Sequence, residues 1–391
     1  LKHLDGSILP IQGPPGTGKT YNGSRLIVEL IKIGKKVGVT AVSHSVILGF
    51  LEGVKSQAEK HDVKIQIKHK VSSQTKIEED DNISFSKTED ALVLLNEGAV
   101  VGGTAWLWAD DQIEGALDYL FVDEAGQMSL ANVLAVSKAT KNLILLGDPQ
   151  QLEQPQKGAH PEGADVSALQ HVIGEEQTLS DEKGIFLNTT YRLNPEISFF
   201  TSEMYYDSRL DSVKGLDKQV IHGSEKSKYI GSGLFFHPVF HEGNQNVAIE
   251  EVEVITKAVN DLLADNLKWT DREGNINKIT ENDILIVAPY NAQVGMLKRE
   301  LPNFRIGTVD KFQGKEAPIV IYSMTSSTPE DAPRGMSFLY NPNRLNVATS
   351  RAKCICILVG SPALFKPECH SIDQMNWANG FCRYIELAKE L

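Results

Sequence analysis

The segment 13–20 has the residue types and the spacing of a phosphate-binding loop. It reads Gly-Pro-Pro-Gly-Thr-Gly-Lys-Thr and lies between an apolar run at 8–12 and a helical pattern at 21–33. Glycines let backbone N–H groups curl around a phosphate, and the helix N-terminus adds partial positive charge. The lysine would reach the β- and γ-phosphates, and the final threonine would hold Mg²⁺. The residues expected to bind the nucleotide are Gly13, Pro14, Pro15, Gly16, Thr17, Gly18, Lys19 and Thr20.

Two carboxylates close a second strand-like run, at 119–123. Asp123 would hold Mg²⁺ beside Thr20, and Glu124 would accept the proton of an attacking water. Successive residues of a strand point to opposite sides, so the two carboxylates would serve different roles. The alternative is a plain solvated turn, which an acidic pair also favours.

A third polar group follows the apolar run at 143–147, where residues 147–152 read Gly-Asp-Pro-Gln-Gln-Leu. An amide just past a central strand can contact a γ-phosphate and respond to its loss. Gln151 is the candidate for that role. The alternative is a simple Gly-Asp-Pro turn.

The elements around these residues predict an α/β protein. Short β-branched runs alternate with helical stretches, which is typical of mostly parallel sheets with crossover helices. The clearest helical stripe lies at 247–263. We expect two units, 1–180 and 181–391, with a small accessory insertion at 51–98. The strand-like runs are 8–12, 37–42, 99–104, 119–123, 143–147, 185–187, 234–236, 283–288, 305–308, 319–324 and 354–359.

Six motifs occur in the order found in superfamily 1 helicases, and the chain resembles that family across nearly its whole length. Within that family, the chain looks like the DNA2/NAM7-like branch, whose members move 5′→3′. The sequence around the loop also resembles that of helicases fused to RecB-like nucleases. This resemblance predicts a nuclease domain in the same polypeptide. After the phosphate-binding loop, the motifs are residues 123–127, 147–152, 190–195, 307–316 and 346–353.

The resemblance implies two tandem RecA-like P-loop NTPase domains that hydrolyse ATP with Mg²⁺ between them. Arg192 and Arg351 would be arginine fingers that neutralise charge on the γ-phosphate. The alternatives are that Arg192 caps or ion-pairs at a helix start, and that Arg351 faces solvent. Further nucleotide contacts implied by the family are adenine stacking by Tyr191, a ribose contact by Glu316, and coupling of ATP to the strand path by Gln313 and Gly314.

The sequence departs from the family's pattern at the residue that would recognise the base of the nucleotide. The family carries a glutamine upstream of the loop that recognises adenine, and here Gln12 lies too close to Gly13 to serve. Hydrolysis of nucleoside triphosphates with bases other than adenine is therefore an open alternative.

Contacts with a nucleic-acid strand are implied in both halves. The implied contacts are Ser43, His44, Thr104, Pro289, Tyr290, Gln293 and Thr308. Trp106 and Trp108 are expected to pack in the core. One basic stretch contains Lys55, Lys60, Lys64, Lys68, Lys70 and Lys76. Residues 63–68 alternate apolar and polar, which predicts a strand with one cationic face, or a solvated edge strand whose lysines prevent pairing.

The composition limits how nucleic acid could be held. The 391 residues carry a formal charge of −12, and both halves are acidic, which argues against a general nucleic-acid coat. No apolar run is long enough to span a membrane. The chain begins at Leu1 without a leader, so we expect a fragment of an intracellular protein, cytoplasmic or, in a eukaryote, nuclear. Cys354 and Cys356 share a strand face and are expected in the core rather than at a metal site.

These observations favour an ATP-dependent, Mg²⁺-requiring helicase or translocase on single-stranded DNA, or RNA as the less favoured strand, acting as a monomer without membrane attachment. A second hypothesis is a nucleotide-gated module that binds nucleic acid or a partner without unwinding. A nucleotide kinase or GTPase would share only the loop and leave the five later motifs unexplained.

Overall fold

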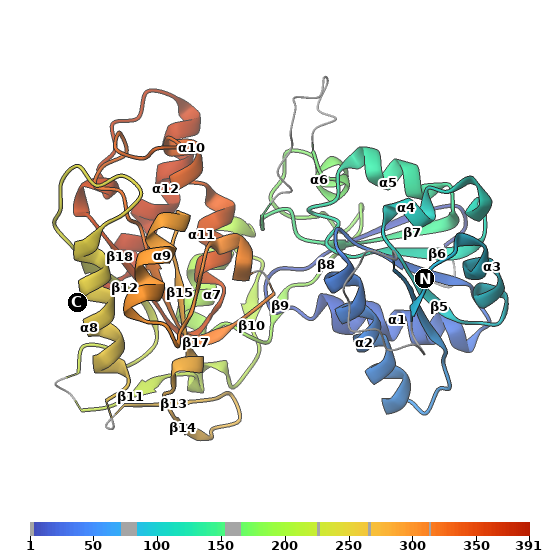
Figure 1. Cartoon of the computed structure of the whole chain (residues 1–391), viewed down its shortest axis with the longest axis horizontal. Helices are drawn as coiled ribbons and strands as arrows, with labels where there is room; N and C mark the ends of the chain where they lie inside the picture. Colours follow the sequence, from blue (N-terminus) through green and yellow to red (C-terminus); the bar gives the residue numbers. More distant parts are fainter. Residues whose placement is uncertain (1–3, 72–83, 153–165, 225–226, 265–266, 313) are drawn as a thin grey trace. The chain divides into compact units, whose positions relative to one another are not determined.

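The computed structural model describes residues 4–71, 84–152, 166–224, 227–264, 267–312 and 314–391 (Figure 1). Two compact units are present. The first contains Leu1–Pro14 and Gly18–Leu187, and the second contains Pro15–Thr17 and Asn188–Leu391. Lys76 and Gln313, both named above, lie outside the described residues.

An eight-stranded sheet forms the first unit, with the order β4-β3-β5-β2-β6-β7-β1-β8. Every pairing between neighbours in it is parallel. The central strands are almost continuously apolar, as a sheet covered on both faces requires. The strands are β1 (Ile8–Gln12), β2 (Val37–Thr40), β3 (Ile67–Lys70), β4 (Ser84–Phe85), β5 (Val100–Gly102), β6 (Leu117–Val122), β7 (Thr140–Gly147) and β8 (Ile185–Phe186).

Helices cover both faces of this sheet, and each face has its own core. Alternate residues of β6 and β7 divide between the two: Phe121 and Ile144 pack with α1 and α2, while Leu120 and Leu145 pack with the other four helices. This is the alternation that a pleated strand imposes. The helices are α1 (Lys19–Lys32), α2 (His44–Lys60), α3 (Thr88–Asn96), α4 (Ala105–Trp108), α5 (Leu130–Ser137) and α6 (Ala168–Ile173).

The second unit is built on a six-stranded parallel sheet in the order β16-β15-β17-β18-β12-β19. Its strands are β12 (Gly233–Pro238), β15 (Ile284–Val287), β16 (Arg305–Gly307), β17 (Ala317–Ser323), β18 (Ala352–Gly360) and β19 (Lys389–Glu390). Two small sheets accompany it. They contain β9 (Thr189–Thr190) with β10 (Asp211–Ser212), and β11 (Ile221–His222) with β13 (Lys268–Thr270) and β14 (Ile276–Lys278).

Two groups of helices accompany the large sheet of the second unit. The apolar residues of α8 (Ile249–Leu262) and α9 (Asn291–Glu300) share one core with alternate residues of β15, β17 and β18. The remaining helices are α7 (Pro195–Tyr205), α10 (Met336–Leu339), α11 (Pro342–Thr349) and α12 (Ile372–Leu387). The predicted pair of α/β units with mostly parallel sheets is thus confirmed.

Two predicted boundaries differ from the structure. The first unit ends at Leu187 rather than near Asp181, because β8 pairs in parallel with β1 and so completes the first sheet. The interval 51–98 is not a separate insertion in its described part, because β3 and β4 extend the same sheet beside β5. The cationic strand begins at Ile67 and has neighbours on both sides, so it is not an edge strand.

The cysteines of β18 behave as core residues. Cys354 and Cys356 are fully buried, and burial raises the pKa of both thiols to about 12. Within the described ranges, no cluster of three or more potential metal-ligating side chains occurs, and no helix is long and apolar enough to cross a membrane.

Candidate nucleotide site and nucleic-acid surface

The phosphate-binding loop connects β1 to α1 as its sequence predicts. The loop starts against β7, where Gly13 N donates to Gly147 O at 2.9 Å. Gly18 takes a left-handed conformation, with φ 76°, at the start of α1. Lys19 Nζ donates to Gly13 O at 2.6 Å, so the ammonium is held over the loop, while Thr20 is exposed. The loop therefore presents a cation and a hydroxyl at one helix N-terminus.

The tip of the loop groups with the second unit. Gly16 O accepts from Tyr191 N, and Pro15 O accepts from Thr190 Oγ1, both at 2.9 Å. A Cβ at Gly16 would lie 2.5 Å from Arg192 Cβ, and the φ of Gly16 is 76°. Only glycine fits such a close approach in this backbone conformation.

Asp123 lies at the end of β6 with its carboxyl buried. Burial, and after it the charge of Glu124, raise the pKa of Asp123 to about 7, although a hydrogen bond from Glu124 N at 3.0 Å and the charge of Lys19 oppose the increase. A buried carboxylate of this kind gains from a nearby cation. Together with the hydroxyl of Thr20 it supplies the oxygen ligands that Mg²⁺ prefers, so the donor set fits the ion.

Glu124 differs from Asp123 in both exposure and backbone conformation. Its side chain is partly exposed, and its φ is 52°. Positive φ is uncommon for a residue with a Cβ, and such conformations cluster at functional sites. The chain thus turns directly after the strand that buries Asp123, and the two carboxylates differ in their access to solvent.

The segment after Glu124 packs backbone to backbone against the end of β7. Ala125 N donates to Leu146 O at 2.7 Å. A Cβ at Gly126 would lie 2.5 Å from Asp148 O, and one at Gly147 would lie 2.5 Å from Gly126 N. The glycines of the second and third motifs therefore allow these two strand ends to meet.

Gln151 is buried, and its Nε2 donates to Asp148 Oδ2 at 2.9 Å. Asp148 also accepts from Gln150 N at 3.2 Å and lies 3.5 Å from Gln12 Nε2. The Asp148 carboxylate thus holds Gln151, the candidate γ-phosphate contact, in place. The sequence analysis did not identify Asp148. The signal was present, because an acidic residue directly after a buried parallel strand lies at the carboxyl edge of the sheet.

Arg192 and Glu316, to which separate nucleotide contacts were assigned, form one cluster in the second unit. Arg192 Nε lies 2.5 Å from Glu316 Oε2, and Lys353 Nζ lies 2.7 Å from Glu316 Oε1. Burial opposes ionisation of Glu316, but the charges and hydrogen bonds of Arg192 and Lys353 outweigh it and lower its pKa. Glu316 is therefore the organiser of two cations as well as a candidate ribose contact.

The other nucleotide candidates of this unit differ in exposure. Arg351 is only 2% exposed, and its Nη1 donates to Lys315 O at 3.4 Å, so the alternative of a solvent-facing Arg351 does not hold. Tyr191 is 52% exposed, which leaves its ring face accessible. Gly314 has a φ of 76°.

Three candidate strand contacts of the first unit lie after neighbouring strands. Ser43 caps α2, accepting from Val46 N at 3.3 Å, and His44 Nδ1 lies 3.1 Å from His69 Nε2. Thr104 begins α4 without a side-chain cap bond. Of the two nearby tryptophans expected in the core, Trp108 is buried, but Trp106 is 88% exposed, so that prediction is wrong for Trp106.

The candidates of the second unit are mostly buried. Pro289 and Tyr290 are covered, while Thr308 is partly exposed. Gln293 is fully buried, and its amide bonds to Ser323 Oγ at 3.0 Å and to the backbone of Ala248. The predicted strand contact by Gln293 is not supported, because these internal bonds occupy its amide.

Gln293 belongs to a buried polar network that sequence analysis also missed. Its centre is Glu251, which accepts from Ser323 Oγ at 2.5 Å and from Thr325 N at 3.0 Å. His241 Nε2 lies 3.1 Å from the same carboxylate. Glu251 lies inside the predicted helical stretch 247–263, and only the tertiary structure shows that its carboxylate is buried.

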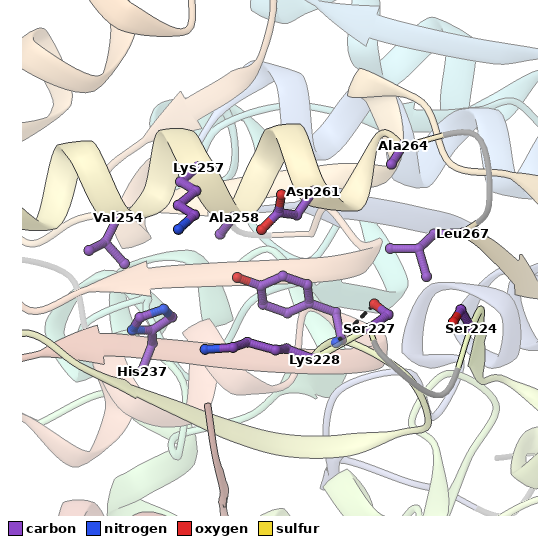
Figure 2. Close-up of a pocket in the computed structure, with 11 residues that line it drawn as sticks. Ser224, Ser227, Lys228, His237, Val254, Lys257, Ala258, Asp261, Ala264 and Leu267 are labelled. Atoms are coloured by element: carbon purple, nitrogen blue, oxygen red, sulfur yellow. Dashed lines mark hydrogen bonds between the residues drawn. The ribbon is translucent and has the colours of Figure 1, made fainter.

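A cavity of about 620 Å³ lies elsewhere in the second unit (Figure 2). Lys257 and Asp261 point from α8 toward the segment that carries Lys228 and His237. Burial lowers the pKa of His237, and the charges of Lys228 and Lys257 add to the decrease. Among the described residues, none of the predicted site residues lines this cavity, so it is separate from their nucleotide and strand contacts.

Two protein-family models match this chain. A family model described as an AAA domain matches residues 164–363, slightly more than half of the chain. A second AAA domain model matches residues 3–173.

Several curated relatives align with most of the chain. They include the putative helicase mov-10-B.1 of Danio rerio, 28% identical over 91% of this chain and 40% of the relative. The DNA replication ATP-dependent helicase/nuclease dna2 of Schizosaccharomyces pombe is 26% identical over 90% and 26%, respectively. The ATP-dependent helicase NAM7 of Saccharomyces cerevisiae is 26% identical over 90% and 40%. The chain thus spans less than half the length of each of these relatives.

Proposed function

This chain belongs to the AAA domain family and to the superfamily 1 helicases, and we propose that it is an ATP-dependent helicase or translocase on single-stranded nucleic acid. The observation that carries the proposal is the carboxyl edge of the first sheet. There, β6, β7 and β1 are neighbours, and their ends carry Asp123, Asp148 with Gln151, and the phosphate-binding loop. Ligands of open parallel sheets bind at this edge.

The proposed chemistry starts from the loop and α1. Lys19 binds the β- and γ-phosphate oxygens of ATP, and backbone N–H groups of the loop bind the remaining phosphate oxygens. Thr20 and Asp123 would hold Mg²⁺, which when bound neutralises charge on the phosphates. Glu124 accepts a proton from the attacking water, and Gln151, held by Asp148, contacts the γ-phosphate.

The second unit would complete catalysis with cations. Arg192 and Arg351 are proposed to neutralise charge that develops on the transferring phosphoryl group. Support for Arg192 comes from its contacts with Glu316 and with Ser350 O, at 3.3 Å, which fix its guanidinium. Tyr191, with an accessible ring, is proposed to stack on the base, and Glu316 to contact the ribose.

The proposed substrate is a single strand held by few charges. Ser43, His44, Thr104 and Thr308 are proposed to contact its backbone, and weak contacts of this kind permit release at each step. The name dna2 suggests DNA for that relative, and NAM7 and mov-10-B.1 leave the strand unspecified. We therefore propose DNA or RNA as substrate, with 5′→3′ movement, as the superfamily branch implies.

An unwinding assay tests this proposal. Duplexes of DNA and of RNA, each with a matched 5′ or 3′ single-stranded tail, are incubated with ATP and Mg²⁺. We expect strand separation from the 5′-tailed duplexes only, and none when a non-hydrolysable analogue replaces ATP. Strand-stimulated ATP hydrolysis without separation of any duplex would instead support the nucleotide-gated binding module. Absence of both would contradict the proposal.

A further inference from the structure

Trp106 is a large aromatic side chain on the surface of the first unit. It is 88% exposed, whereas Trp108, two residues later on the same short helix, is 0% exposed. Single exposed apolar residues are common, but a tryptophan exposed to this extent gives up a large burial energy. The surroundings of the ring decide whether it has a role.

The ring of Trp106 is held outward by the packing of its neighbours. Trp108 Nε1 donates to Val39 O at 3.2 Å and to Gly103 O at 3.1 Å, and Leu107 is buried. A Cβ at Gly103 would lie 2.5 Å from Leu107 Cδ2, so the helix sits tightly on the end of β5. Residues two apart on a helix point in nearly opposite directions, so an anchored Trp108 directs Trp106 to solvent.

The location of Trp106 is the same sheet edge that carries the proposed strand contacts. α4 begins directly after β5, and β5 pairs with β2, which Ser43 and His44 follow. Thr104, which starts α4, is two residues from Trp106 and does not cap the helix with its side chain. An aromatic face can stack on a base of a single strand, and a hydroxyl beside it can donate a hydrogen bond to a phosphate oxygen.

We propose that Trp106 stacks on a base of the single strand, next to a phosphate contacted by Thr104. This inference rests on the proposed function and adds a base contact to it. Next to Trp106 in the sequence, Ala105, Ala109 and Asp110 are small or acidic and add no large apolar side chain. A protein partner would require a wider apolar patch around the aromatic anchor. A flat base needs only the ring, and stacking tolerates any base sequence in DNA or RNA.

The test combines a change in the protein with a change in the strand. Binding of labelled oligothymidylate, and of the same strand with abasic sites, is measured for the wild type, Trp106→Ala and Trp106→Phe. We expect Trp106→Ala to weaken binding of oligothymidylate on the order of 10-fold and Trp106→Phe to restore most of it. On the abasic strand, the wild type and Trp106→Ala should bind equally, because no base is present to stack.

A second readout is intrinsic fluorescence. Oligothymidylate should quench the tryptophan emission of the wild type, and Trp106→Ala should lose that quenching, while its melting temperature stays unchanged because the ring is exposed. Equal affinity of wild type and Trp106→Ala for oligothymidylate would overturn the inference. A loss of equal size on both strands would also overturn it, because the ring would then act without a base. If the wild type binds no strand, the proposed function itself is wrong.

Discussion

At the scale of single residues, Arg192 pairs with Glu316 and is also proposed to contact the γ-phosphate of ATP in the transition state. The Arg192 side chain is 13% exposed, so this side chain is largely shielded from water. If Arg192 stabilises the transition state, Arg192→Ala should lower kcat at least about 100-fold and change ATP affinity only a few-fold. Single-turnover hydrolysis and equilibrium binding of an ATP analogue measure the two effects.

The matched control for Arg192→Ala is Arg272→Ala. Arg272 also pairs with a glutamate, Glu273 at 2.5 Å, but its side chain is 50% exposed, so turnover should not change. Equal losses of turnover and of ATP affinity in Arg192→Ala would contradict the finger role and leave Arg192 as a binding residue.

His69 makes the stability of the first unit depend on pH. It is buried beside His44, and burial, followed by the nearby His44, lowers its pKa from 6.5 to about 4. The unfolded chain therefore binds a proton at higher pH than the folded chain does, and acid favours unfolding. The free energy of unfolding should fall as the pH decreases from about 6.5 toward 4.

Urea unfolding at a series of pH values measures this effect, and His69→Gln should flatten the profile across that window. An unchanged pH profile in His69→Gln would show that His69 is not the responsible group.

At the scale of elements, the contact between the second and third motifs depends on Gly126. A methyl group there would collide with the backbone oxygen of Asp148, which cannot move without shifting Gln151. Gly126→Ala should therefore destabilise the protein by about 1–3 kcal/mol and reduce ATP hydrolysis. Thermal or urea unfolding, with a hydrolysis assay, measures both consequences.

Gly49→Ala provides the opposite case for comparison. Gly49 lies within α2, where an added Cβ would meet nothing within 4 Å. The alanine should stabilise the protein by about 0.5–1 kcal/mol, because it restricts the unfolded chain and favours the helix. Destabilisation by both substitutions to the same extent would rule out the close approach at Gly126 as the cause.

The elements of the fold differ in how far the sequence alone predicts them. Strands such as β1 and β7 were predictable, because continuous apolar runs flanked by glycine have few other solutions. The positions of Asp123 and Lys19 were also predictable, because each follows one of the apolar strands at a fixed motif spacing. The pairing of β8 with β1 and the burial of Gln293 were not predictable, since both depend on contacts between residues far apart in the sequence. Local pattern also cannot show which of Trp106 and Trp108 turns inward.

At the scale of the whole molecule, the net charge of −12 limits how a strand is held. The proposed contacts Ser43 and Thr104 carry hydroxyl groups, and hydroxyl contacts release few counterions. The affinity for single strands should therefore fall with salt on a shallow slope, given that each neutralised phosphate contributes about −0.7. Fluorescence titration at several salt concentrations measures this slope. A logarithmic slope steeper than about −5 would indicate many ion pairs and contradict this view of the surface.

The central claim is that the phosphate-binding loop of this chain drives strand-dependent ATP hydrolysis. Its most direct test is steady-state hydrolysis, with and without single-stranded DNA, by the wild type, Lys19→Ala and Lys32→Ala. Lys32 lies at the other end of α1 and pairs with Glu29 at the surface, so its loss should change nothing. We expect strand-stimulated turnover in the wild type and Lys32→Ala, and a decrease of at least about 100-fold in Lys19→Ala. Wild-type turnover in Lys19→Ala would contradict the claim.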